Sequence, residues 1–319
     1  MTTIVTGAGA FAGQPARLDA KTGFFLEGEL EKIDDRVFVQ PKPMLNALGG
    51  LFPVKSDFAD WQKSYSYRAL SSVGKAKILD PAANDFPIVN AQREEFTTPL
   101  MPIGAAVVYD ARDLAAAVNN NLNLDEALFM AARRAIEEKV NSIAFSGDQD
   151  HGLHGLLTHP GIGRLAAANA IASGTTAANN LIELNKLANS APNNSGQVES
   201  PDIALLPPDS YQASSQQRHD TGTDTTTLSF WLGTNGYIST AQPIRELSGA
   251  TILTAGTAGT SDVAVSFRRD PMVLELLFSG IQRLPIMQTG PLTYQVPFVG
   301  YCGGMVVRLP KGVLMLTGV

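Results

Sequence analysis

The strongest constraint on the fold is a run of apolar residues between positions 123 and 147 that repeats at helical spacing. An apolar residue at every fourth position predicts a helix buried along one face. About 23 residues at 1.5 Å per residue would make a rod roughly 35 Å long. We call residues 124–146 the spine helix and expect other elements to pack around it. Its apolar stripe comprises Leu124, Leu128, Ala132, Ile136, Val140 and Ala144, broadened by Ala135 and Ile143.

The ends and the outer face of the spine helix carry signals that agree with this prediction. Asn123, followed three residues later by Glu126, resembles a capping box. Gly147 can adopt the left-handed conformation that ends many helices. Two Arg/Glu pairs at a spacing of four residues are expected on the outer face, each stabilising the helix by roughly 0.2–0.5 kcal/mol. These pairs are Arg133 with Glu137 and Arg134 with Glu138.

The composition favours a protein that buries surface against other subunits. Charged residues make up 17% of the 319 residues, against about 25% in typical proteins. The buried centres of permanent subunit contacts are depleted in charge, although an ordinary soluble protein with a neutral polar surface stays open as the alternative. The net charge is −6, and no run of Lys or Arg is longer than two. The chain therefore does not have the composition of a dedicated nucleic-acid binder.

The sequence predicts a soluble protein made in the cytoplasm. Cys302 is the single cysteine, so no disulfide can form within the chain and a reducing compartment is allowed. Residues 1–16 contain neither a basic residue nor a sustained apolar run, which argues against a secretory signal. No stretch approaches the roughly 20 apolar residues that a membrane-spanning helix needs. We therefore expect no membrane partner.

Residues 4–9 look like a strand that enters the glycine-rich loop of a nicotinamide-dependent oxidoreductase. The strict form of that motif needs glycine where Ala12 stands, and Pro15 interrupts the helix that should follow. No tyrosine is followed four residues later by lysine, so the usual acid–base pair is missing. We therefore predict a flexible arm and keep the oxidoreductase as a distant alternative. Prolines at 41, 43 and 53 indicate that residues 24–54 lie extended across a surface.

From Trp61 to Tyr109 the pattern is that of strands, and two strand pairs around a turn at DPAAND predict a long hairpin. Neither face carries many large apolar residues, and an isolated hairpin without a core is marginal in water. It should therefore lie on another surface, and both a neighbouring subunit and its own domain stay open. The charged residues along the hairpin are our candidate assembly interface: Lys75, Lys77, Arg93, Glu94 and Glu95.

The remaining segments predict a mixture of helices and strands. A short helix is expected at 111–118, before the spine helix. Residues 173–289 alternate helical and strand patterns, which is typical of an α/β or α+β module. This module includes a polar loop at 190–201 and a strand at 243–247. Residues 290–319 predict closing strands with a bend at Gly303-Gly304, packed back against the spine helix.

We predict no catalytic residue, no cofactor site and no metal site. His151, His154 and His159 lie in a glycine-rich loop, and two carboxylates are their only acidic neighbours, which is weak evidence for zinc. Asp220-Thr221-Gly222 matches the aspartic-protease triplet, but the chain has no second copy to share its proton. No nucleophile elbow, phosphate loop or HExxH motif is present.

The order of these parts resembles that of the major capsid proteins of tailed bacteriophages, whose HK97-type fold is shared with encapsulin shells. The chain is similar in particular to a subfamily of encapsulin-like phage capsid proteins. The resemblance spans residues 27–319, and no single motif carries it alone. The segments that carry it, in chain order, are LEGELEKIDDRVFVQ, SYSYRALSSVGKAKILD, IGAAVVYDARDL, AARRAIEEKVNSIAFSGD, GLHGLL, IALLPPDSY and GGMVVRLP.

The resemblance implies an α+β, HK97-like capsid fold and a structural function. It implies that the chain self-assembles into hexamers and pentamers of an icosahedral head that encloses the DNA genome. The protein would be part of the virion and would be assembled in the cytoplasm of the host bacterium. The implied division of the chain is an N-terminal arm (1–61), an E-loop hairpin that reaches over an adjacent subunit (62–103), a peripheral domain (104–172 and 290–319) and an axial domain (173–289).

The resemblance also bears on partners. A negative net charge suits a shell that contacts double-stranded DNA weakly and non-specifically. Scaffolding, portal and decoration proteins stay open as partners, and an encapsulin-type nanocompartment stays open as an alternative function. Some relatives link subunits covalently through lysine, but nothing marks Lys63, Lys75 or Lys77 as reactive. Because the hairpin begins near residue 62, we expect neither a long N-terminal scaffolding segment nor its cleavage.

Overall fold

The computed structural model describes five parts of the chain, namely residues 41–78, 88–110, 112, 124–254 and 257–319. The chain divides into two units, Met1–Met44 and Leu45–Val319. The second unit holds the helices and strands that the structure describes. Four sequence-based predictions lie largely or wholly outside the described residues: the first 40 residues of the arm predicted at 1–61, the hairpin turn at 80–85, the helix at 111–118 and the cap at Asn123.

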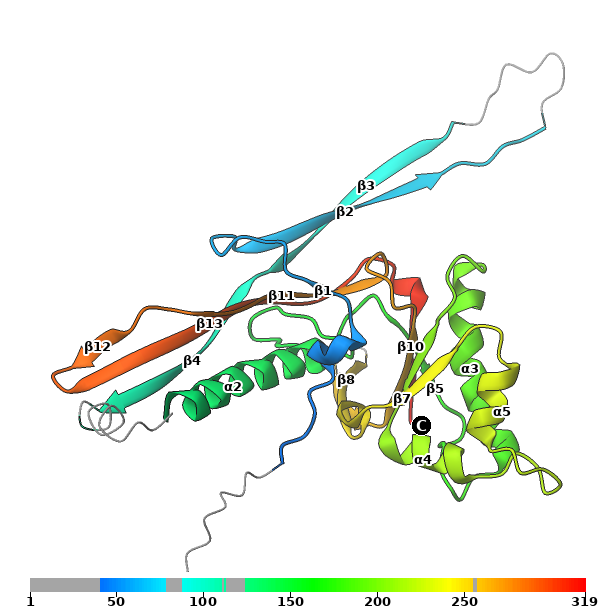
Figure 1. Cartoon of the computed structure of the whole chain (residues 1–319). Coiled ribbons are helices and arrows are strands. Elements are labelled where there is room, and N and C mark those ends of the chain that lie inside the picture. Colours follow the sequence, from blue (N-terminus) through cyan, green and yellow to red (C-terminus); the bar gives the residue numbers. More distant parts are fainter. Residues whose placement is uncertain (1–40, 79–87, 111, 113–123, 255–256) are drawn as a thin grey trace, which may run out of the picture. The chain divides into compact units, whose positions relative to one another are not determined.

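The first sheet is built around one long strand near the C-terminus. Its members are β1 (Val54–Lys55), β4 (Met101–Asp110), β11 (Leu274–Arg283), β12 (Met287–Gly290) and β13 (Thr293–Val307). Strand β13 pairs antiparallel with β4 along one edge and with β11 and β12 along the other (Figure 1). β1 extends the sheet in parallel beside β11. The predicted closing strands thus include the central strand of this sheet, and the predicted bend is present at Gly304, where φ is +73°.

The spine helix is α2, which spans Leu124–Ser146 as predicted and packs against β4 and β13. Gly147 ends it with φ +74°, and its amide donates to the carbonyl of Ile143. Both predicted Arg/Glu pairs form, each with an N–O distance of 2.8 Å. Ala135 is exposed, so its expected place in the stripe is wrong. It lies about 100° around the helix from Ile136, outside the buried face.

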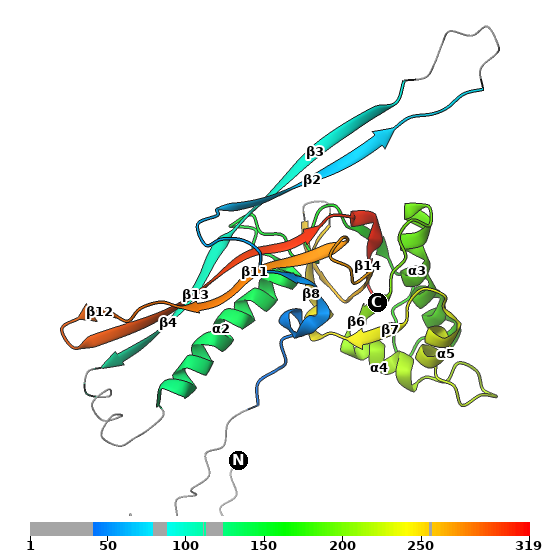
Figure 2. The same ribbon diagram turned by 45° about the horizontal axis from the view of Figure 1, so that its top comes forward.

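The three central strands of the second sheet are buried on both faces, whereas its two edge strands are largely exposed. Its order is β5 (Gly163–Ala166), β14 (Val313–Thr317), β10 (Val263–Phe267), β6 (Ile203–Leu206) and β7 (Thr240–Pro243). Side chains alternate along each strand. In β6, Ile203 and Leu205 join the core shared with α2, whereas Ala204 and Leu206 face the core of α3 and α5. Figure 2 shows these two helices beside the sheet. The sequence of a strand that is buried on both faces is a continuous run of apolar residues, and IALL in β6 is such a run.

The helices of the predicted α/β module are α3 (Ala177–Ser195), α4 (Pro208–Gln216) and α5 (Thr227–Thr234). The polar loop predicted from residue 190 begins later, because α3 continues through Pro192, which is buried, and ends at Gly196 with φ +66°. The strand predicted at 243–247 is instead the end of β7 followed by a 3-10 turn, η3 (Arg245–Leu247). Leu247 is fully buried, and its amide donates to the carbonyl of Ile244, which closes that turn.

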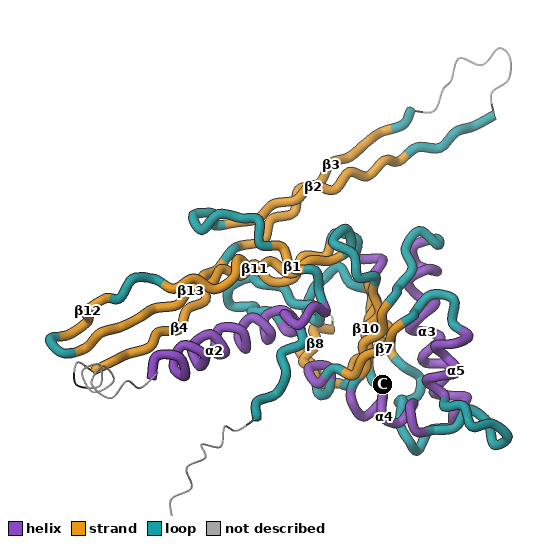
Figure 3. Tube along the Cα trace, viewed as in Figure 1, coloured by secondary structure: helices purple, strands orange, loops and turns teal. Residues whose placement is uncertain are grey.

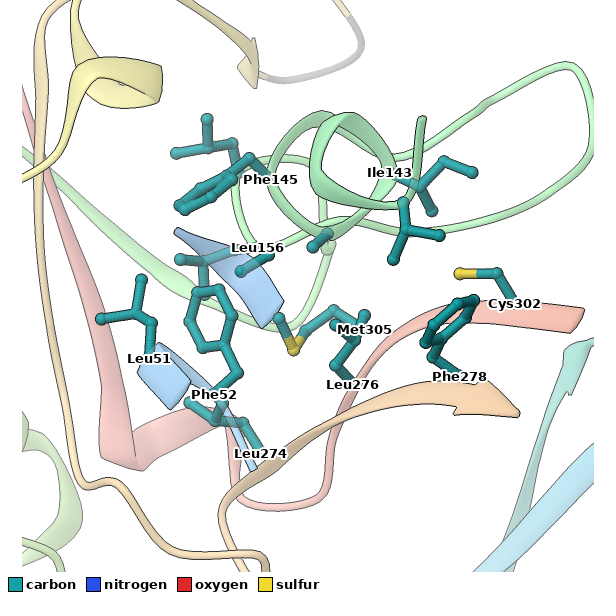
Figure 4. Close-up of a cluster of buried hydrophobic side chains, with 14 of the residues drawn as sticks. Leu51, Phe52, Ile143, Phe145, Leu156, Leu274, Leu276, Phe278, Cys302 and Met305 are labelled. Atoms are coloured by element: carbon teal, nitrogen blue, oxygen red, sulfur yellow. The ribbon is translucent and has the colours of Figure 1, made fainter. Parts of the chain in front are cut away.

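Residues 47–52 differ from the extended surface chain expected at 24–54. They form a short π-helical turn, η2 (Ala47–Leu51), whose apolar side chains enter the main core. The amide of Ala47 donates to Asn141 Oδ1 of the spine helix at 2.9 Å. The ring of Phe52 packs edge-on against Phe145, with centroids 5.6 Å apart (Figure 4). This short segment, flanked by prolines, is therefore part of the core.

The two sheets do not each coincide with one of the predicted domains. β11 and β12 fall in the predicted axial range, 173–289, yet pair with β13. β14 falls in the predicted closing segment, 290–319, yet lies between β5 and β10. The domain boundaries stay a prediction. A separate two-stranded sheet, β8 (Ala250–Thr254) with β9 (Thr257–Ser261), contributes Ala250 and Ile252 to the main core.

Candidate assembly surface

The predicted hairpin is present as β2 (Ser64–Val73) and β3 (Asn90–Pro99). Ten antiparallel residue pairs join the strands, from Ser64 opposite Pro99 to Val73 opposite Asn90. In Figure 3 both strands are continuous along this ribbon. Residues 74–78 follow β2 without strand structure, and the predicted turn at 80–85 lies outside the described residues. The sequence therefore predicted both strands but extended each of them too far toward the turn.

The hairpin exposes large apolar side chains to solvent. Burying a side chain of this size contributes about 1.5–3 kcal/mol, so leaving several exposed favours association with another surface. Sequence reasoning relied on the charged residues and missed this apolar set. The alternation of residues along β2, which places Leu70 on the same face as Arg93, could have revealed part of it. The exposed apolar residues are Leu70 (69%), Ile78 (101%), Ile88 (91%), Val89 (67%) and Phe96 (44%).

The five predicted interface residues are all exposed, but they do not form one cluster. Lys75 and Lys77 lie beyond the paired part of β2. On β3, Glu95 faces Arg68 across the strands, with Nε and Oε2 3.2 Å apart. Both side chains of that pair are more than half exposed, so it contributes at most about 1 kcal/mol. These charges are therefore better suited to choosing a partner's orientation than to stabilising the hairpin itself.

A second exposed apolar surface lies on the first sheet, on the face away from the spine helix. Val108 of β4 and Met287 of β12 both stand opposite Gln295 of β13 and so share one face. The neighbouring pair, Val107 and Val296, points the other way and is buried in the main core. Val108 is 59% exposed and Met287 is 52% exposed. We call Val108 and Met287 the outer sheet face.

The residues that could suggest an enzyme do not form a catalytic or metal-binding arrangement in the described parts of the chain. His151 Nδ1 lies 3.0 Å from Asp148 Oδ1, and the rings of His154 and His159 meet edge-on with centroids 5.8 Å apart. Nowhere in the described ranges do three or more His, Cys, Asp or Glu side chains gather as a metal would require. Asp220 accepts a hydrogen bond from the amide of Thr221 within its own exposed turn.

His159 is held in its neutral form. The amide of Gly161 donates to His159 Nδ1 at 3.2 Å, so that nitrogen is an acceptor. Burial, followed by the nearby charges of His154 and Arg164, lowers the pKa of His159 from 6.5 to about 4. Protonation would break the bond from Gly161 and place a second cation beside Arg164.

We expect the stability of unassembled subunits to fall at acidic pH because of His159. The unfolded chain binds a proton near pH 6.5 and the folded chain only near pH 4, so stability is full above pH 6.5 and is lost as the pH falls through 4. Urea unfolding at several pH values between 7 and 4 measures this loss. In a His159→Gln variant the slope over that window should be shallower; an unchanged slope would assign the acid sensitivity to other groups.

Two further features limit the chemistry of the chain. Burial raises the pKa of the Cys302 thiol to about 11, so this cysteine is not a nucleophile in the folded subunit. Among the helices in the described parts of the chain, none combines the length and apolar character needed to cross a bilayer.

Solved structures of two capsids and of an encapsulin shell are similar to this chain. The capsid protein of Myoviridae phage XM1 aligns with a TM-score of 0.78 and 16% identity, over 93% of this chain and 100% of that one. The capsid of a native GTA particle aligns at 0.62 with 9% identity, over 91% and 95% of the two chains. The SrpI encapsulin of Synechococcus elongatus aligns at 0.54 with 14% identity, over 91% and 93%. The predicted α+β capsid fold of the HK97 type is confirmed.

A comparison with family models agrees with the fold. The model described as major capsid protein matches residues 74–319, from the distal hairpin to the last residue. A search of curated proteins gave no match. The matched range contains the spine helix, both large sheets except β1, and most of the exposed apolar residues of the hairpin. This chain belongs to the major capsid protein family.

Proposed function

We propose that the chain assembles into hexamers and pentamers of a closed icosahedral head, in which each hairpin lies across an adjacent subunit. The observation that carries this proposal is the set of exposed apolar side chains on β2 and β3, on the residues that follow β2 and on those that precede β3. Most of the hairpin side chains that the structure describes beyond the base are exposed. A neighbouring copy would bury them and stabilise the assembly by several kcal/mol per subunit, at about 1.5–3 kcal/mol per side chain.

The role that we propose is structural and not catalytic. His151, His159 and Asp220 serve local contacts within loops and turns. In the described parts of the chain, no arrangement of a nucleophile with a base supports a reaction. We propose that residues 62–103 act as the E-loop and that 104–172 with 290–319 form the peripheral domain. Residues 173–289 would then form the axial domain, whose loops meet around the symmetry axes.

We base our proposal for the contents of the shell on the net charge of the chain, and our proposal for the place of assembly on its family. A subunit with a net charge of −6 repels DNA at long range, so we propose weak, non-specific contact with a packaged double-stranded genome. Assembly would take place in the cytoplasm of the host bacterium. Scaffolding, portal and decoration proteins are proposed partners. An encapsulin-type compartment is the second candidate, which the structural likeness to the SrpI encapsulin supports.

Electron microscopy of the purified protein tests the proposal. Expressed alone, it should form closed shells or rings of five and six subunits, with sedimentation far faster than that of a 33.9 kDa monomer. A species that stays monomeric at every concentration would contradict the proposed assembly. Shells isolated from the native source should contain DNA; shells that contain a protein cargo and no DNA would favour the compartment.

A further inference from the structure

The base of the hairpin is fastened to the first sheet by a small set of polar contacts centred on Arg308. Arg308 Nη2 donates to Tyr65 Oη of β2 at 3.1 Å and to Glu275 Oε2 of β11 at 2.5 Å. Its other terminal nitrogen, Nη1, donates to the carbonyl of Pro271. One guanidinium therefore connects the hairpin to β11 and to the connection that precedes it.

A second tyrosine of β2 repeats this connection one step further along the strand. Tyr67 Oη donates to the carbonyl of Val307 at 3.1 Å, and its ring stacks on Phe96 of β3 with centroids 5.3 Å apart. Tyr65 and Tyr67 are two residues apart, so both side chains leave the same face of β2. We call Tyr65, Tyr67, Glu275 and Arg308 the hairpin clasp.

The clasp marks the end of the anchored part of the hairpin. Beneath it, Leu100, Leu277 and Val306 form a small buried cluster, against which Tyr65 and Tyr67 pack. Further out, Leu70 is 69% exposed, and every described side chain of β3 from Asn90 to Thr97 is exposed. Because the two strands are paired over ten residues, a change of angle at the base moves the distal residues by a much larger distance.

The positive charge of Arg308 is balanced by the neighbouring carboxylate of Glu275. The Arg308 side chain is 20% exposed and that of Glu275 is 11% exposed. Burial alone would lower the pKa of Arg308, but the hydrogen bonds that its guanidinium donates to Glu275 and Tyr65 outweigh this effect, and the pKa is raised. A planar guanidinium fixes the direction of each bond that it donates. The ion pair with Glu275 thus holds Arg308 in the orientation that reaches Tyr65.

We propose that the hairpin clasp is a positioning device, in which Arg308 sets the direction of the hairpin relative to the first sheet and so the angle between adjacent subunits. This inference rests on the proposed assembly of the chain into shells. The clasp acts through the hairpin and does not itself touch a neighbour. Its loss should therefore leave a folded subunit whose hairpin points in a range of directions.

The test removes only the phenolic hydroxyls, in a Tyr65→Phe/Tyr67→Phe double variant. Both rings, the cluster beneath them and the Arg308–Glu275 pair stay. Tyr237→Phe, at an exposed tyrosine whose hydroxyl donates to no described residue, is the matched control. If the double variant does not fold, as judged by circular dichroism, Tyr65→Phe alone replaces it. A merely structural role would lower the melting temperature without changing the direction of the hairpin.

The direction of the hairpin is read out by distances between spin labels. Labels at Gln92→Cys on β3 and Ala131→Cys on α2 occupy exposed positions, whereas native Cys302 is buried and stays unlabelled. Labelled subunits are diluted with unlabelled ones. One narrow distance distribution is expected in the parent protein and in the Tyr237→Phe control, and a distribution at least twice as broad in the double variant. An unchanged distribution in the double variant would overturn the proposal.

Electron microscopy of the same preparations separates this proposal from the proposed function. Closed shells of one size are expected from the parent, and shells of mixed size or open sheets from the double variant. Shells of one size from the double variant would show that the clasp does not control the angle between subunits. If the parent itself forms no shell, the proposed assembly fails, while the distance measurement still decides whether the clasp directs the hairpin.

Discussion

Ile136→Asp is expected to prevent the subunit from folding. The Ile136 side chain is 1% exposed and lies on the buried face of α2, in the main core. The substitution removes an aliphatic side chain and places a carboxylate where no described cation is paired with it. Together these changes should cost at least about 5 kcal/mol, comparable to the whole stability of many domains, about 5–15 kcal/mol. The measurement is the soluble yield and the urea unfolding midpoint of purified subunits.

Two control variants show whether the cost comes from the buried charge. Ile136→Val removes one methylene group and should cost only about 0.5–1.5 kcal/mol. Ala135→Asp places the same carboxylate one residue earlier, on the exposed face, and should change stability by no more than about 1 kcal/mol. A soluble Ile136→Asp subunit with a normal unfolding midpoint would mean that this face of the helix is not buried in solution.

Shortening the hairpin is expected to abolish shell formation while the subunit stays folded. Ser71 stands opposite Gln92, so replacing residues 72–91 with Asn-Gly joins the strands through a two-residue turn and keeps their register. The change removes Ile78, Ile88 and Val89, all more than 60% exposed. Losing these three side chains, at about 1.5–3 kcal/mol each, removes at least about 4.5 kcal/mol of association energy per subunit. The concentration needed for assembly would rise by roughly 1,000-fold or more.

Sedimentation and electron microscopy measure the assembly, and urea unfolding measures the fold. The unfolding free energy should change by less than about 1 kcal/mol, because the removed side chains that the structure describes have little contact with their own subunit. A Lys75→Ser/Lys77→Ser variant keeps the apolar residues and should still form shells, with an altered dependence on salt. Normal shells from the shortened variant would show that the distal hairpin is not an assembly surface.

Much of this fold could be predicted from the sequence, because strong local patterns specify it. The spine helix combines a period of four with a glycine stop, so its range was predicted correctly. β6 is a short apolar run closed by two prolines, and such a run can only be a buried strand or part of a buried helix. In these segments local preference and burial point to the same structure.

Other features depend on contacts between distant segments, which no local pattern reports. Ala47 and Phe52 lie among prolines and read as a surface chain, yet they are buried because Asn141 and Phe145 of α2 lie beside them. The clasp joins Tyr65 to Arg308, 243 positions apart. The exposure of Leu70 and Ile88 could not be predicted for a different reason. A side chain that another subunit covers has the same local sequence pattern as a side chain that its own subunit covers.

The path of the chain between the two sheets has a mechanical consequence. The backbone leaves the second sheet after β10, enters the first through residues 268–273, and returns through residues 308–312 to β14. β3 ends at Pro99 and β4 begins at Met101, so tension applied to the hairpin enters the first sheet along β4. The strands then carry the force, and the antiparallel hydrogen bonds of β4 with β13 and of β10 with β14 are loaded in shear. Rupture in shear would have to break many of these hydrogen bonds at the same time, whereas peeling the strands apart would break them one after another.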